Sequence, residues 1–73
     1  MSIIDERAET YGDPAINMER TAALWSAFLE HEITAHDVAI CMILVKVSRA
    51  KVSPHTDNYT DIRGYSDIAE MLA

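Results

Sequence analysis

Two carboxylates near the C-terminal end of the sequence have a spacing that suits metal chemistry. Asp57 and Asp61 stand four residues apart, which places them on one face of a helix, and His55 lies just before them. Two carboxylates and an imidazole can hold a divalent cation such as Mg²⁺. The same stretch also suits a helix start, where Asp57, Asn58 and Asp61 cap the backbone and face the positive end of the dipole. The pattern favours the helix start over the metal site.

Four further residues are candidates for an anion-binding site, with two cations and two stacking rings: Arg49, Arg63, Tyr59 and Tyr65. The alternative assigns both arginines to helix electrostatics. Arg49 and Lys51 fall in the last turn of a predicted helix, where cations complement the dipole. Arg63 and Asp67 stand four residues apart and can pair on one helix. The alternative is the stronger prediction for Arg49.

Signals for nucleophilic or zinc chemistry are weak. Cys41 lies in an apolar run, where burial makes a thiol inert. Ser48 and Ser53 lack a nucleophile motif, and the sequence has no Gly-rich phosphate loop. The acidic and histidine-containing stretch 30–37 lacks zinc-ligand spacing, so it predicts a solvated turn. No catalytic residue and no cofactor is expected.

The elements that must position these residues are helices over 13–30, 34–52 and 57–73. Asp13 followed by Pro14 is a favourable helix start. Thr34 with Asp37 has the spacing of a capping box, and Pro54 ends the second helix. Short connections between successive helices favour antiparallel neighbours.

The third helix is expected to begin among Thr56, Asp57 and Asn58, with Asn58 and Asp61 in a second capping box. Gly64 inside it allows close approach of a neighbouring backbone. Its predicted apolar stripe follows helical spacing: Tyr59, Ile62, Ser66, Ala69 and Leu72.

Residues 1–12 are expected to form a short N-terminal helical arm, because Ser2 and Asp5 also have capping-box spacing. A helix this short is marginal alone, so the arm must dock on something or fray.

The middle helix is apolar nearly all round. Its first stripe includes Val38, Cys41, Met42 and Val45, and its second is Ile40, Ile43, Leu44 and Val47. Two other short helices cannot cover both stripes, and a helix that is apolar on every side is buried. We therefore expect the second stripe to be an oligomer interface.

The chain length leads to the same expectation. Seventy-three residues predict a single domain, 1–73, and a core this small rarely supplies more than about 3–5 kcal/mol. The single cysteine excludes an intrachain disulfide. The expected core draws on all three helices: Met18, Ala22, Trp25, Phe28, Val38, Cys41, Met42, Val45, Ile62, Ala69 and Leu72.

The charge balance limits the partners. Twelve acidic and six basic residues give a formal charge of −6, which argues against binding to DNA, RNA or an anionic membrane. The N-terminus lacks the pattern of a signal peptide, and no apolar run approaches the roughly 20 residues of a membrane span. We expect a cytoplasmic protein.

Three stretches together, 7–14, 37–49 and 57–65, resemble a family of short, uncharacterised bacteriophage and prophage proteins. This resemblance covers nearly the whole chain and implies the host-cell cytoplasm as the location. It implies no specific activity.

The stretch 57–65 is also distantly similar to the acidic helix of MazG-type nucleoside triphosphate pyrophosphohydrolases, which are all-α oligomers that hold Mg²⁺ with carboxylates. Asp61 corresponds to the last carboxylate of their motif, but Asn58 stands where a Glu is common. Of the earlier acidic pair, only Glu19 has a counterpart here. The resemblance therefore implies nucleotide binding more readily than hydrolysis.

The combined prediction is an all-α chain, with a short N-terminal helical arm and three helices in a bundle completed by oligomerisation. We expect the protein to act by binding, either to itself or to a host protein, and not by catalysis. The alternative is nucleotide binding or a degenerate MazG-like pyrophosphohydrolase that uses Mg²⁺.

Overall fold

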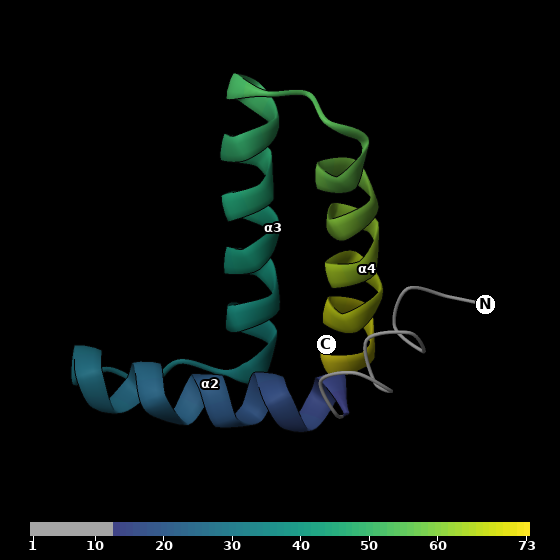
Figure 1. Ribbon diagram of the computed structural model, residues 1–73. Helices are drawn as coiled ribbons and strands as arrows, with labels where there is room; N and C mark the ends of the chain where they lie inside the picture. The colour runs from purple at the N-terminus through teal and green to yellow at the C-terminus, as the bar shows by residue number, and fades with distance from the viewer. Residues whose placement is uncertain (1–12) are drawn as a thin grey trace.

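The computed structural model describes residues 13–73, which fold into three α-helices and contain no strand (Figure 1). These are α2 (Pro14–Leu29), α3 (Ala35–Val52) and α4 (Thr56–Leu72). The predicted all-α class is confirmed for this part of the chain. The predicted arm, 1–12, lies outside the described residues.

The predicted start of α2 is confirmed. The Asp13 carboxylate accepts hydrogen bonds from the backbone N–H groups of Ala15 at 2.8 Å and Ile16 at 3.4 Å, and Pro14 opens the first turn. The helix ends at Leu29, and its C-cap Glu30 has a left-handed backbone with φ 53°. That conformation costs a residue with a Cβ about 1–2 kcal/mol.

The turn after α2 is closed by a side chain. The Ser26 hydroxyl accepts from the N–H of Ile33 at 2.9 Å and donates to the Ile33 carbonyl at 3.1 Å. This pair of bonds ties the end of the turn back to the last part of α2 and fixes where α3 can begin.

The predicted capping box of α3 is present. The Thr34 hydroxyl accepts from the N–H of Asp37 at 3.0 Å, and the Asp37 carboxylate accepts from the N–H of Thr34 at 2.9 Å. At the other end, Ser53 caps α3 one residue before Pro54. Arg49 and Lys51 fall in the last turn, as predicted.

The predicted N-cap of α4 is wrong, since the helix begins one residue earlier than predicted. His55 is the N-cap, because its ring Nδ1 accepts from the N–H of Asp57 at 3.2 Å, and the helix therefore begins at Thr56. Asn58 lies inside the first turn and donates through Nδ2 to the Ser53 carbonyl at 2.8 Å, so it forms no capping box with Asp61.

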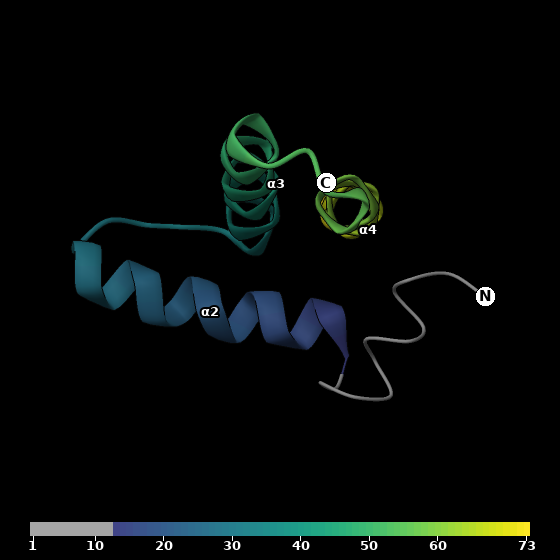
Figure 2. The same cartoon turned by 45° about the horizontal axis from the view of Figure 1, so that its top comes forward.

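The helices α3 and α4 lie antiparallel and side by side, and α2 crosses beneath their lower ends (Figures 1 and 2). The most extensive packing joins α3 to α4, and α2 contacts α3 more than α4. The antiparallel prediction is thus correct for α3 and α4 and wrong for α2 and α3. The left-handed Glu30 and the Ser26 bonds turn the chain so that α3 leaves α2 crosswise.

Small residues dominate the core where the helices meet. The buried positions in residues 13–73 are Ala22, Val38, Ala39, Gly64, Ile68 and Ala69. Met18, Tyr65 and Leu72 are partly buried and pack against the cluster of Ala39, Ile68 and Ala69. Alanines and a glycine let helix backbones come close, but they bury little apolar area.

Three predicted core residues lie at the surface. Phe28 is 86% exposed, Val45 is 39% exposed and Cys41 is exposed. The stripe assignment treated each helix as covered along its whole length, whereas α2 and α3 meet only where they cross. The rest of the predicted core is buried or partly buried: Met18, Ala22, Trp25, Val38, Met42, Ile62, Ala69 and Leu72.

The predicted stripe of α4 is also turned from the observed one. Tyr59 and Ser66 are exposed, while Gly64 and Ile68, which that stripe omitted, are buried against the other helices. Ile62, Ala69 and Leu72 belong to both the predicted and the observed faces. The buried Gly64 agrees with the expectation of close backbone approach.

Replacing Ile68 with Ala should lower the free energy of unfolding by about 2–4 kcal/mol, since Ile68 is 2% exposed and its loss leaves a cavity. The matched control is Ile16→Ala, at a position 53% exposed, where the change should stay within about 0.5 kcal/mol. Urea unfolding measures both. Equal effects at the two sites would contradict the observed core.

The capping box should be visible in a titration. The Thr34 backbone N–H and hydroxyl both bond the Asp37 carboxylate and hold its pKa below the ordinary value. Asp37 therefore stabilises the fold above its unfolded pKa and loses that contribution as the pH falls through its folded pKa. NMR titration should place the Asp37 midpoint below that of an unfolded peptide, and Thr34→Val should move it part of the way up. An unshifted midpoint in the folded protein would contradict the box.

Candidate binding surface

An ion pair joins α3 to α4 near the middle of their contact. Lys46 Nζ lies 2.8 Å from Asp61 Oδ2, and the two side chains are 15% and 16% exposed. Such a shielded pair is held in one geometry, unlike a surface pair that water screens. The carboxylate predicted as a metal ligand is therefore already opposite a cation.

The other predicted metal ligand lies in water at the start of α4. The Asp57 side chain is 84% exposed, and its Oδ2 lies 3.6 Å from Nδ1 of His55. The same nitrogen accepts a hydrogen bond from the Asp57 backbone N–H at 3.2 Å. Across residues 13–73, no three His, Cys, Asp or Glu side chains gather closely enough to hold a metal ion together.

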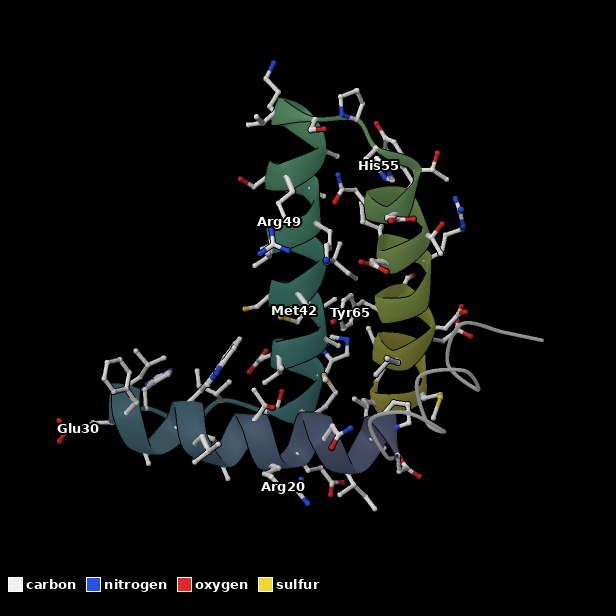
Figure 3. The ribbon with its side chains drawn as sticks, in the orientation of Figure 1. Arg20, Glu30, Met42, Arg49, His55 and Tyr65 are labelled. Carbon is white, nitrogen blue, oxygen red and sulfur yellow. The ribbon has the colours of Figure 1, made fainter. Side chains whose placement is uncertain are left out.

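The four residues predicted to bind an anion occupy different surroundings. Arg49 lies toward the upper end of α3, whereas Tyr65 lies lower, between α3 and α4 (Figure 3). Arg63 is exposed and donates through Nη2 to the Thr60 hydroxyl at 3.4 Å, and not to Asp67 as predicted. Tyr59 is 45% exposed.

Apolar side chains remain in water along one side of α3, which we call the outer face (Ile40, Ile43, Leu44 and Val47). Leu44 is 61% exposed, Val47 is 49% exposed and Ile40 is 39% exposed, while Ile43 is half-buried. Three of the four predicted interface residues are thus exposed, and Ile43 is partly covered.

A second apolar surface lies at the free end of α2. Phe28 is 86% exposed, Leu24 is 65% exposed and Leu29 is 55% exposed. Sequence reasoning assigned Phe28 to the core and gave the free end of α2 no role. The acidic residues that follow, Glu30 and Glu32, are the signal that this helix end faces water.

Exposed apolar side chains therefore gather on α3 and on the free end of α2. Contiguous exposed apolar side chains mark surfaces that contact other proteins, whereas single ones are ordinary. No described helix is long and apolar enough to cross a bilayer.

The ion pair should show measurable coupling. In a double-mutant cycle of Lys46→Met and Asp61→Asn, the loss of unfolding free energy in the double mutant should differ from the sum of the two single losses by about 1–3 kcal/mol. The coupling is expected because the pair is shielded from water. The exposed His55 and Asp57 provide the control cycle, with His55→Ala and Asp57→Asn. Coupling no larger than in that control would show that Lys46 and Asp61 do not hold α3 to α4.

The whole chain matches one protein family. Residues 1–73 align with the model of a family described as a domain of unknown function, DUF6378. The Gene 55 protein of Mycobacterium phage D29 is 43% identical over 68 residues, which cover 92% of this chain and 45% of that protein. The Gene 55 protein of Mycobacterium phage L5 is 42% identical over 69 residues, which cover 92% and 44%. No solved structure matches the chain.

These comparisons support the predicted resemblance to uncharacterised phage proteins, and they give no likeness to MazG-type enzymes. The chain spans less than half the length of the two curated relatives. Because the family model covers every residue and the relatives exceed 40% identity, the chain belongs to the DUF6378 family.

Proposed function

We propose that the protein acts by binding other protein chains, first of all another copy of itself, and not by catalysis. The observation that carries the proposal is the uncovered outer face of α3, where Leu44 and Val47 stand about half or more exposed in a helix otherwise packed at its base. A binding partner that covers this face removes its apolar area from water, which is favourable by roughly 25 cal/mol per Å².

The small core supports the same proposal. Val38 and Ile68 are the largest side chains fully buried within the described residues, so the three helices alone remove little apolar surface from water. Small domains with such cores are commonly stabilised by association. A second copy supplies the missing cover without any further protein.

The alternative of nucleotide and Mg²⁺ binding draws less support from the geometry. Asp61 would have to exchange the Lys46 ammonium for a metal ion, and Asp57 would have to ligate from open water. Mg²⁺ keeps several waters but binds proteins through one or two free carboxylates and substrate phosphates. The pairing of Asp61 therefore disfavours this reading.

A single charge on the outer face should reduce self-association. Leu44→Glu places a carboxylate on the proposed interface, where burial without a partner is costly, and should lower the mass measured by sedimentation velocity at micromolar concentration. The matched control is Met71→Glu, at a position on α4 that is 60% exposed against 61% for Leu44.

A lower mass for Leu44→Glu, with the wild-type mass kept by Met71→Glu, supports the proposal. Equal masses for wild type and Leu44→Glu would remove the outer face as a copy–copy contact. In that case a host protein becomes the occupant to seek, by cross-linking from Cys41, the single exposed thiol.

A further inference from the structure

Two apolar stripes diverge from the point where α2 crosses α3. Along α3, burial falls with distance from the crossing, from Val38 at 0% exposed through Val45 at 39% to Val52 at 87%. These positions are seven residues apart, so they share one side of the helix. We define the open corner as Val38, Val45 and Val52 of α3 together with the free end of α2, which extends past the base of α3 (Figure 1).

The same decline runs along α2. Ala22 is 5% exposed and Trp25 is half-buried, while Leu29, seven residues from Ala22 and on the same side, is 55% exposed, with Phe28 beside it at 86%. Phe28 and Val52 are the two most exposed large apolar side chains of the described residues, and each stands at the far end of its helix. The open corner is thus packed where the two helices cross and exposed at its two far ends, the end of α2 and the end of α3, which we call the tips.

The two tips carry opposite charge. Glu30 and Glu32 follow the end of α2, and Arg49 and Lys51 occupy the last turn of α3. Figure 3 shows Glu30 at the free tip of α2 and Arg49 near the upper end of α3. Within residues 13–73, the side chains of these four residues form no ion pair.

Glu30 is also locally unfavourable in two ways. Its left-handed backbone suits glycine, and its carboxylate stands beside the negative end of the α2 dipole. A local cost of this kind at a surface residue points to a use for its charge elsewhere.

We infer that the open corner holds a second copy of this chain, related by a two-fold axis. In that arrangement the α3 helices of the two copies run antiparallel across the axis. The free end of each α2 then reaches the C-terminal end of the other α3. Phe28 meets the partner subunit's Val52, and Glu30 and Glu32 face the partner subunit's Arg49.

Symmetry favours a second copy over an unrelated partner. A two-fold contact needs a surface that complements itself, so that each acidic tip finds a basic tip and each exposed ring finds an exposed valine. The corner supplies both matches from one chain. Opposite charges placed so also fix the register of the two copies and disfavour the parallel arrangement, which would put like charges together.

This inference rests on the proposed function, because it names a second place where copies meet. The test therefore uses the Leu44→Glu background, in which the outer face is blocked. In that background, Glu30→Lys with Glu32→Lys makes both tips basic, and Arg49→Glu with Lys51→Glu makes both tips acidic.

Sedimentation equilibrium of the Leu44→Glu chain should give a dimer. Each tip variant alone should weaken that dimer on the order of tenfold, because like tips meet. An equimolar mixture should restore a one-to-one dimer to within about threefold of the parent, because basic tips then meet acidic tips.

The matched controls change the net charge equally at exposed positions outside the corner. Glu19→Lys with Glu70→Lys, and Arg20→Glu with Arg63→Glu, should each dimerise like the Leu44→Glu parent. If these controls weaken the dimer as much as the tip variants, net charge and not the corner decides association, and the inference fails.

Two further results separate this inference from the proposed function. A Leu44→Glu chain that is monomeric with intact tips would overturn the corner and leave the outer face standing. The opposite result is a Leu44→Glu chain that keeps the wild-type mass, while its tip variants have a lower mass that is restored when they are mixed. That result would support the open corner and rule out the outer face as a contact between copies.

Discussion

The crosswise contact of α2 with the base of α3 is the constraint on which the rest of the structure depends. Where the helices cross, Ala22 and Val38 are buried, and Met18 packs against the α3–α4 cluster. Because two crossed helices touch over a short length, each keeps an apolar stripe that continues into water. The uncovered surface follows from this crossing and not from a few misplaced residues.

The crossing is itself set by short-range interactions. The Ser26 hydroxyl holds Ile33, the Thr34 and Asp37 pair starts α3, and Glu30 turns the backbone through a left-handed conformation. On the other side, the Lys46 and Asp61 pair aligns α3 with α4. The chain thus specifies its helix geometry through polar groups, while its small apolar core contributes less than a larger domain would supply.

Helix positions and most caps were predictable, because Asp13, Thr34, Asp37 and Pro54 act on their own neighbours in sequence. The His55 cap was missed, since imidazole is an uncommon cap and better ones follow it. The exposure of Phe28 was not predictable from periodicity, because a stripe records which side of a helix is apolar but not how far its neighbour extends. The candidate site was likewise predictable only in its local part. Sequence spacing placed Asp61 on a helix, whereas the packing of α3 against α4 placed Lys46 opposite it.

The two phage relatives are more than twice as long as this chain. It spans less than half of the two phage Gene 55 proteins, so the activity of a protein of that length can involve residues beyond these 73. We propose that these residues contribute a surface for association. The most direct measurement is sedimentation equilibrium of the wild-type chain across micromolar concentrations. We predict a mass that rises with concentration above the 8.2 kDa of one chain, and a constant 8.2 kDa would contradict the account.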